Sequence, residues 1–249
     1  RRRRVTSDQV AGTVADAGEE GLSLAGGRNP CREEVVLDHG SPTAEVVSAE
    51  RRLLDVFKFY VMQDAYYLTH FAKVQAIGAT KAKDLKTTQS FAHHAEQTCA
   101  AELALHESFM ELLGVTEEDW KLFEPSPHAY AYVSHMYRSA EGDLADVLAA
   151  LLPCYWLYYE IGERLKMATP EEPIFQKWIG TYGSEWFGEL VNEQIERMDS
   201  LAEGLPEERR KELKTRFMRS SYYEWQFWQQ AWTMETWELP EEKESVPHA

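Results

Sequence analysis

The sequence lacks aromatic residues over its first 56 positions. All 8 Trp, 12 Tyr and 10 Phe of the 249-residue chain lie between Phe57 and Trp237. The opening stretch instead holds four consecutive arginines and six of the 14 glycines. Such a composition buries too little apolar surface to offset the entropy cost of ordering the chain. We therefore expect residues 1–49 to be an atypical, disordered segment, followed by one domain over 50–240 and a tail over 241–249.

Cysteine and positive charge are also scarce. The three cysteines, Cys31, Cys99 and Cys154, form no C-x-x-C pair, which argues against a disulfide framework or a structural zinc site and favours a reducing, cytoplasmic setting. The chain has 26 Lys and Arg against 42 Asp and Glu, a net charge of −16. This charge disfavours nucleic acid and anionic membranes as partners and suits a neutral or cationic small molecule.

Several functional motifs are missing. No continuous apolar run approaches the roughly 20 residues of a membrane span, and no apolar segment follows the N-terminal arginines as in a secretion signal. The sequence contains no P-loop, no G-x-G-x-x-G and no G-x-S-x-G. It also contains no Glu-x-x-His, the motif that di-iron bundles use. We expect His93, His94 and His106 to be solvated or structural, and Cys99 to pack among small residues.

From about residue 48 onward the hydrophobic pattern has helical spacing, with no strand-like alternation. Glycine- and proline-containing stretches interrupt it. The fold class predicted is therefore all-α, with helices near 48–80, 86–113, 127–140, 143–168, 172–202 and 206–237.

Two carboxylates stand where core residues are expected. In the first helix an apolar row with 4,3,4,3 spacing runs from Phe57 to Phe71 and includes Asp64. In the last helix a similar row runs from Phe217 to Ala231 and includes Glu224. Because a buried charge is costly unless it is paired, each is a candidate for ligand binding or acid/base chemistry. The alternatives are an Asp64 satisfied by a neighbouring helix and a Glu224 at the rim of an offset stripe.

A cysteine occupies a third such position. In the segment LLPCYWLYYE, Cys154 follows Pro153 and lies one turn before Tyr158. Proline disrupts a backbone hydrogen bond, so we expect a kink beside the thiol, and a phenol at i+4 can favour the reactive thiolate. The alternative is a buried cysteine that acts only as a small hydrophobic residue.

From about Leu53 to Trp237 the sequence resembles the thiaminase II (TenA) family. The segments that carry the resemblance are FKFYVMQDAYYLTHFAKVQAIGA, HAYAYVSHMYRS, LAALLPCYWLYYEIGE, WIGTYGSEWF and SSYYEWQFW. The resemblance implies an all-α, haem oxygenase-like bundle that assembles as a homotetramer and uses no metal or organic cofactor. It implies hydrolysis of thiamine or of 4-amino-5-aminomethyl-2-methylpyrimidine to the hydroxymethylpyrimidine, in thiamine salvage.

The resemblance also implies roles for individual residues. Cys154 corresponds to the nucleophile and Glu224 to the acid/base group, while Tyr67 tunes the cysteine. Asp64 corresponds to the residue that grips the aminopyrimidine. The remaining positions line the substrate pocket, and they are Tyr132, Tyr158, Tyr182 and Phe227.

The first 49 residues depart from the family pattern. They contain neither the Trp nor the His-Pro-Phe turn of the helix that the family places before FKFY. We interpret this segment as the product of a shifted or misassigned reading frame. Two other functions stay open on the sequence alone: a non-catalytic pyrimidine-binding regulator, and a metal oxidase of the haem oxygenase-like fold.

Overall fold

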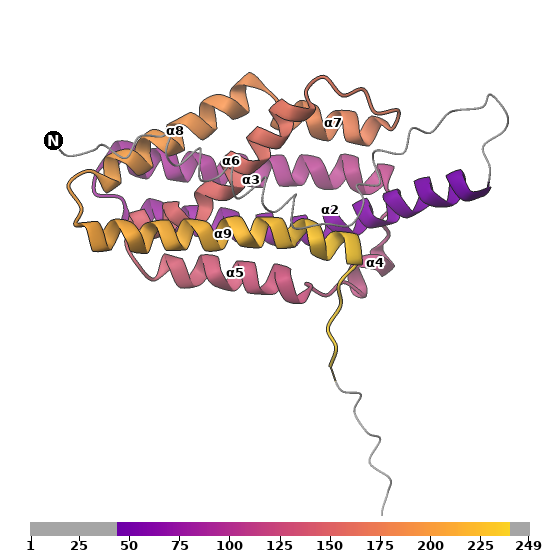
Figure 1. Cartoon of the computed structure of the whole chain (residues 1–249), viewed down its shortest axis with the longest axis horizontal. Helices are drawn as coiled ribbons and strands as arrows, with labels where there is room; N and C mark the ends of the chain where they lie inside the picture. The colour runs from indigo at the N-terminus through magenta and orange to yellow at the C-terminus, as the bar shows by residue number, and fades with distance from the viewer. Residues whose placement is uncertain (1–43, 240–249) are drawn as a thin grey trace, which may run out of the picture.

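The structure, a computed structural model, describes residues 44–239 apart from the side chains of 44–51 and 102–107. The tail 241–249 and residues 1–43 of the segment 1–49 lie outside the described residues. Residues 44–49, which were expected in the disordered segment, belong to helix α2 (Ala44–Lys81). Figure 1 shows the described part as a bundle of long helices. The helices are α2 (Ala44–Lys81), α3 (Leu85–Leu112), α4 (Glu117–Lys121), α5 (Pro127–Ala140), α6 (Leu144–Leu165), α7 (Pro173–Tyr182), α8 (Glu185–Ala202) and α9 (Glu207–Thr233).

The predicted all-α class is confirmed, since residues 44–239 contain helices and no β-strand. Two details of the prediction are wrong. The stretch 172–202 forms two helices, because Gly183 ends α7 and the Ser184 side chain accepts a hydrogen bond from the Phe187 N–H to begin α8. The short helix α4 was not predicted, although Thr116 and Asp119 form a capping box at its start.

Local sequence explains where three of the other helices begin. Asp84 caps α3 by accepting from the Thr87 N–H. Ser126 caps α5, and Pro127 follows at the first helical position, where its missing N–H costs nothing. Asp143 and Asp146 form a capping box at the start of α6. These side chains satisfy donors that a helix end would otherwise leave unpaired.

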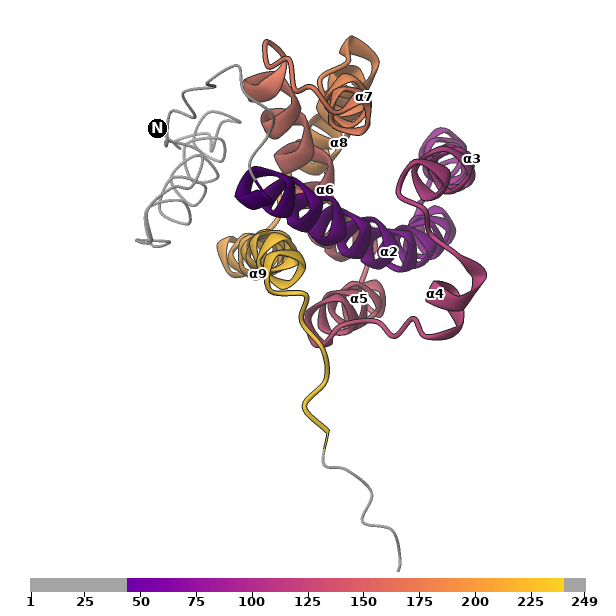
Figure 2. The ribbon, with the colours of Figure 1, turned by 90° about the vertical axis from the view of Figure 1, so that its right-hand side faces the viewer.

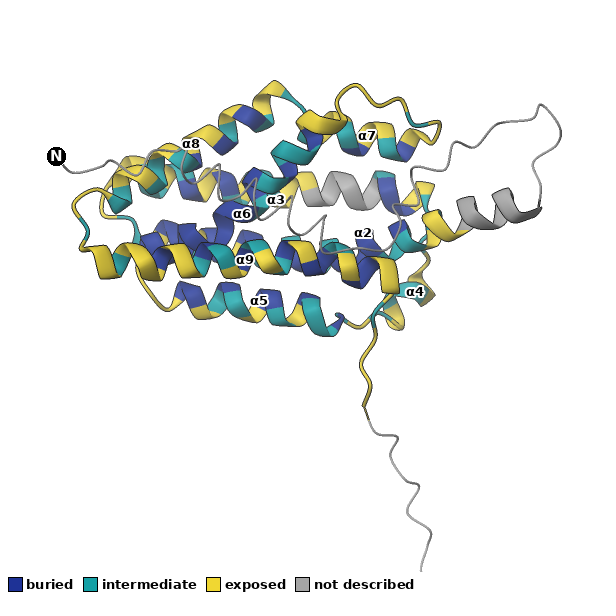
Figure 3. Ribbon diagram, viewed as in Figure 1, coloured by how far each residue is buried: buried dark blue, intermediate teal, exposed yellow. Residues whose placement is uncertain are grey.

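Helices α2 and α6 form the centre of the bundle. Helix α2 contacts α3, α5, α6 and α9, and α6 contacts α2, α5, α7, α8 and α9. Figure 2 shows α2 with α3, α5, α9 and the α7–α8 pair around it, and Figure 3 shows buried residues along most of α6. Helix α6 is long and apolar enough to meet the criteria for a membrane span, but 72% of its most apolar window is buried inside the bundle. It is therefore interpreted as a core helix.

A glycine allows the turn between α7 and α8 to lie against α6. A Cβ atom on Gly162 would lie 2.4 Å from the carbonyl carbon of Tyr182 and 2.5 Å from the Gly183 nitrogen. Only a residue without a side chain permits this backbone approach. Gly162 thereby fixes the position of Tyr182, one of the predicted pocket residues.

Candidate active site

Four of the predicted site residues meet inside the bundle, each from a different helix. Glu224 of α9 is only 3% exposed. The Tyr132 hydroxyl of α5 donates to Glu224 Oε1 at 2.7 Å, and the Tyr67 hydroxyl of α2 reaches the same oxygen at 3.5 Å. The thiol of Cys154 on α6 is close enough to Tyr67 and Glu224 for hydrogen bonding with both to shift its pKa. The arrangement joins a thiol, a carboxyl group and two phenols in one polar cluster.

Glu224 is buried rather than placed at the rim of the stripe. Burial raises the pKa of its carboxyl group to about 7, although hydrogen bonds with Tyr132, Tyr67 and Cys154 favour the ionised form. A carboxyl group with a pKa near neutrality exchanges protons readily at physiological pH, which is the property that acid/base catalysis requires.

Cys154 keeps some accessible surface. Burial raises the pKa of its thiol well above the usual value, and the nearby Glu224 carboxylate raises it further. The hydrogen bond from Tyr67 acts in the opposite direction. The Tyr158 hydroxyl accepts from the Tyr60 hydroxyl at 3.1 Å, so that a hydrogen bond from Tyr158 to the sulfur stays a prediction. Helix α6 also runs through Pro153 without ending there.

Asp64 lies at the edge of this cluster on α2. Its side chain is half-buried, one helical turn before Tyr67. It is close enough for its negative charge to raise the pKa values of Cys154, Tyr60 and Tyr158. A carboxylate in this place suits an electron-poor or cationic ring held next to the thiol.

Aromatic rings enclose the polar cluster on one side. The Tyr158 and Tyr182 rings lie 4.9 Å apart, centroid to centroid, and the Tyr67 and Phe227 rings 5.6 Å apart. Each predicted pocket residue thus lies near the thiol or contacts a residue that lies near it. Rings in this arrangement offer faces on which a planar heterocycle can stack.

Three aromatic residues of this wall were not predicted. The Tyr60 ring stacks on the Trp228 ring, with centroids 4.7 Å apart. The centroids of the Trp178 and Tyr158 rings lie 5.9 Å apart. Each of them is four residues from a predicted site residue on the same helix, which are Asp64, Glu224 and Tyr182 respectively. Helical spacing of four was therefore the signal that would have identified them.

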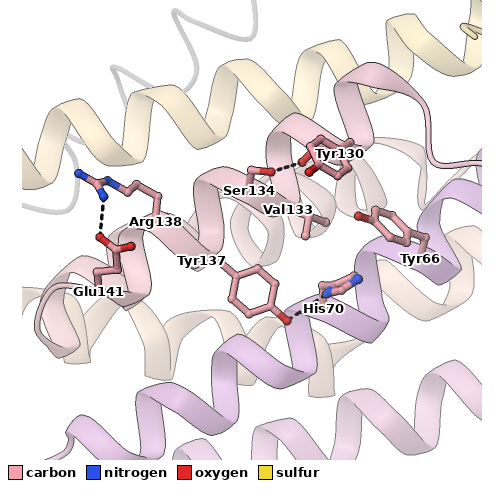
Figure 4. A pocket seen from close by; sticks show the side chains of 8 residues that line it. All are labelled: Tyr66, His70, Tyr130, Val133, Ser134, Tyr137, Arg138 and Glu141. Atoms are coloured by element: carbon pink, nitrogen blue, oxygen red, sulfur yellow. Dashed lines mark hydrogen bonds and ion pairs between the residues drawn. The ribbon is translucent and has the colours of Figure 1, made fainter. Parts of the chain in front are cut away.

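A separate surface pocket of about 480 Å³ lies between α2 and α5 and contains none of the predicted site residues. Figure 4 shows its lining, where Tyr137 bonds His70 and Arg138 pairs with Glu141. Since these polar groups already satisfy each other, the pocket is a weaker candidate than the thiol cluster. Among the described side chains of residues 52–239, no group of three or more His, Cys, Asp or Glu is arranged to hold a metal ion.

Known proteins with similar sequences and structures show which family the chain belongs to. The model of the TENA/THI-4/PQQC family matches residues 51–234, most of the chain. The chain belongs to the TENA/THI-4/PQQC family. The family resemblance predicted from the sequence is thereby confirmed, and the match begins just after the atypical segment 1–49.

Individual members of the TENA/THI-4/PQQC family are similar over the same region. The aminopyrimidine aminohydrolase of Bacillus subtilis (strain 168) is 60% identical over 185 residues, which cover 74% of this chain and 78% of that protein. The aminopyrimidine aminohydrolase of Halalkalibacterium halodurans is 36% identical over 184 residues, covering 73% and 82%. A solved TenA homologue from P. horikoshii OT3 has a TM-score of 0.66 at 30% identity, covering 72% of this chain and 84% of that one.

Proposed function

We propose that this chain is an aminopyrimidine aminohydrolase. It converts 4-amino-5-aminomethyl-2-methylpyrimidine and water into the 5-hydroxymethyl pyrimidine and ammonia, which serves thiamine salvage. The observation that carries the proposal is the 60% identity with the Bacillus subtilis enzyme of that name. The thiol, carboxyl and phenol cluster supports it, because it supplies a nucleophile and a proton donor in one place.

The first half of the reaction forms one bond and breaks another. The sulfur of Cys154 adds to the ring carbon beside the one that carries the aminomethyl group, and the thiol proton passes to a ring nitrogen held by Asp64. The added electron density expels the amine. Glu224, whose pKa of about 7 keeps a proton available, donates it to the departing nitrogen, so that ammonia leaves. An exocyclic methylene remains on the ring.

The second half reverses the addition. Water attacks the exocyclic methylene and gives its proton to Glu224, which restores the carboxyl group. The carbon–sulfur bond then breaks, and the ring proton returns to Cys154. Tyr67 orients the sulfur through its hydrogen bond, and Tyr158, Tyr182 and Phe227 stack around the ring.

An ammonia-release assay tests the proposal. The wild-type protein is assayed with the aminomethylpyrimidine and, in parallel, with thiamine. We expect Cys154→Ser to reduce kcat by about 10³-fold or more while the protein stays folded. Cys99→Ser is the matched control, because the Cys99 side chain is exposed. The prediction that Cys99 packs among small residues is therefore wrong. A wild-type protein that releases no ammonia from either substrate would contradict the proposal.

We also propose that the chain works as a cytoplasmic homotetramer. Tyr222, Trp225 and Trp232 of α9 are 55%, 40% and 45% exposed, and their spacing places them on one face of the helix. Exposed aromatic faces of this kind are typical of protein interfaces. Light scattering coupled to size exclusion measures the mass. A monomer at the concentrations used for the assay would contradict this part of the proposal.

A further inference from the structure

A second polar network lies behind the thiol, and the proposed reaction does not use it. It joins four helices through Tyr155 of α6, Gln75 of α2, His94 of α3 and Gln194 of α8. All four side chains are buried, with exposed fractions between 1% and 6%. Gln75 Nε2 donates to the Tyr155 hydroxyl, which lies 3.2 Å from His94 Nδ1, and Gln194 Nε2 lies 3.4 Å from the His94 ring nitrogens. Buried polar groups are costly to keep, so a network of this size calls for an explanation.

The network adjoins the site through two routes. Tyr155 directly follows Cys154, and successive side chains on a helix point about 100° apart, so α6 presents the thiol to one group of helices and the phenol to another. The Tyr155 ring also packs on Phe71, with centroids 5.4 Å apart. Phe71 in turn packs on Tyr67 at 5.6 Å, and Tyr67 hydrogen-bonds the thiol. The positions of the Cys154 sulfur and of the Tyr67 hydroxyl therefore both depend on the position of Tyr155.

The network is anchored at the surface. His94 Nε2 lies 3.5 Å from Glu193 Oε2, and the Glu193 carboxylate is held by Ser90 and Arg197 at 2.7 and 2.6 Å. One assignment of protons satisfies the contacts of His94 with Glu193 and Tyr155: Nε2–H of His94 points to Glu193, and Nδ1 accepts from the Tyr155 hydroxyl.

The charge state of His94 agrees with that assignment. Burial lowers the pKa of His94, and the nearby Arg197 and His93 act in the same direction, whereas Glu193 raises it. Burial raises the pKa of the Tyr155 hydroxyl well above its ordinary value, so the hydroxyl remains a donor at neutral pH. Neutral His94 therefore accepts from Tyr155 throughout the physiological range.

We infer that Tyr155 and His94 are positioning residues for Cys154. Their hydrogen bond, which Gln75 and Glu193 hold in place, fixes the turn of α6 that carries the thiol. It also fixes the Phe71 ring, on which Tyr67 packs. The inference rests on the proposed function for its kinetic consequence. Its consequence for the thiol itself does not depend on any substrate.

The experiment uses the full chain with Cys31→Ser and Cys99→Ser, so that Cys154 is the only thiol. Two quantities are measured: the steady-state kcat and KM for ammonia release, and the rate of alkylation by iodoacetamide as a function of pH. The variants are Tyr155→Phe, His94→Leu and His94→Asn. The asparagine variant keeps a polar atom near the place of Nδ1. His93→Leu is the matched control, because His93 is the preceding residue on α3 and its side chain is 59% exposed.

We expect Tyr155→Phe and His94→Leu to lower kcat by about 10- to 100-fold and to change KM less than about threefold, since a small displacement of a reacting group has effects of this size. Hydrogen bonding with Tyr67 lowers the pKa of the thiol, and both variants should weaken it. The midpoint of the alkylation profile should therefore move to higher pH. His94→Asn should recover most of the kcat, and His93→Leu should behave as the parent.

Three results would overturn the inference. The first is a folded Tyr155→Phe variant with the parent's kcat and alkylation profile; this single-atom deletion decides the question if His94→Leu does not fold. The second is equal loss of kcat in His94→Leu and His94→Asn, in proportion to the loss of Tm, which indicates packing alone. The third is an unmoved alkylation profile in every variant. A parent that releases no ammonia but whose alkylation midpoint moves in the variants would contradict the proposed function and leave the positioning role supported.

Discussion

Two buried carboxylates of this protein, Glu224 and Asp146, have opposite properties. They are 3% and 4% exposed. Glu224 is surrounded by hydroxyl groups and a thiol, and burial raises its pKa to about 7. Asp146 ion-pairs with Arg209 at 2.5 Å and with Arg216 at 3.0 Å. Burial alone would raise the pKa of Asp146, but hydrogen bonds from Arg209 and the backbone, together with both arginine charges, lower it.

The difference shows that the partners, and not the depth of burial, decide what a buried carboxylate does. Asp146 has two cations and joins the start of α6 to α9, which is a structural task. Glu224 has hydrogen-bond donors but no cation among the partners that shift its pKa. Its proton therefore stays exchangeable near neutral pH, and the group is available for chemistry.

The largest effect that separates the two carboxylates should be on activity. We expect Glu224→Gln to lower the kcat for ammonia release by about 10²- to 10⁴-fold, because glutamine can neither donate nor accept the transferred proton. Its stability should not fall at pH 8, since the amide needs no ionisation inside the bundle. Kinetics and urea unfolding of the same preparation measure both. A kcat within threefold of the wild type would remove Glu224 from the mechanism.

Asp146→Asn should give the reverse result. Asparagine removes the buried charge that pairs with Arg209 and Arg216, and among the described residues only Arg209 keeps other carboxylates, Asp143 and Glu212. We therefore expect a loss of about 3 kcal/mol in the free energy of unfolding. The kcat per folded molecule should stay at the wild-type value. Arg138→Ala is the control, since it breaks the exposed Arg138–Glu141 pair and should cost less than about 1 kcal/mol. Equal effects of the two substitutions would show that Asp146 is not stabilising.

The pH dependence of stability should also differ in sign. The pKa of Glu224 is about 7 in the folded protein and 4.5, its ordinary value, in the unfolded chain. Between pH 4.5 and 7 the carboxyl group is therefore protonated in the folded protein and ionised in the unfolded chain. The free energy of unfolding should therefore fall, on the order of 2–3 kcal/mol, as the pH rises through this window. Asp146 contributes stability above its ordinary pKa of 3.8 and loses it as the pH falls through its lower folded value.

Urea unfolding from pH 3 to pH 8 measures both slopes. Glu224→Gln should remove most of the fall in the free energy of unfolding between pH 4.5 and 7 and leave the loss of stability at acid pH unchanged. Asp146→Asn should reduce the loss of stability at acid pH and leave the fall between pH 4.5 and 7 unchanged. A decline that persists in Glu224→Gln would assign it to another group.

The smallest of these effects should come from the backbone contact behind Tyr182. Gly162→Ala places a methyl group 2.4 Å from the Tyr182 carbonyl carbon, so we expect a loss of about 1–3 kcal/mol and a severalfold higher KM. Gly180→Ala on α7 is the matched control, because its Cβ meets nothing within 4 Å. Alanine there should be neutral or slightly stabilising. An unchanged KM in Gly162→Ala would show that Tyr182 does not contact the substrate.

Much of the fold could be predicted because its signals are local. The caps at Asp84, Ser126 and Asp143 are set by residues within one turn, so the predicted helix starts agree with the observed ones to within two residues. The break between α7 and α8 was missed because the apolar pattern continues across it, from Trp178 through Phe187. Gly183 and the capping Ser184 are local signals for the break, but the continuous apolar pattern outweighed them.

The site could be predicted in part. Spacing alone identified Asp64, Glu224 and Cys154 as polar residues on apolar rows, but it could not identify their partners on other helices. The bond from Tyr132 to Glu224 joins residues 92 positions apart, and the one from Tyr67 spans 157. Such pairs arise from packing between helices. Helix α2 is in addition surrounded by four helices, so no single apolar row describes its buried surface.

The position of Cys154 on the most buried helix has a practical consequence. Of the 22 residues of α6, 14 are buried, and the helix packs on α2, α5, α7, α8 and α9 and reaches His94 of α3 through Tyr155. Amide hydrogens in such a helix exchange with solvent only when the whole domain opens. Heat or urea should therefore abolish ammonia release at the same midpoint at which the helical circular dichroism signal is lost. The assay then reports the folded fraction directly.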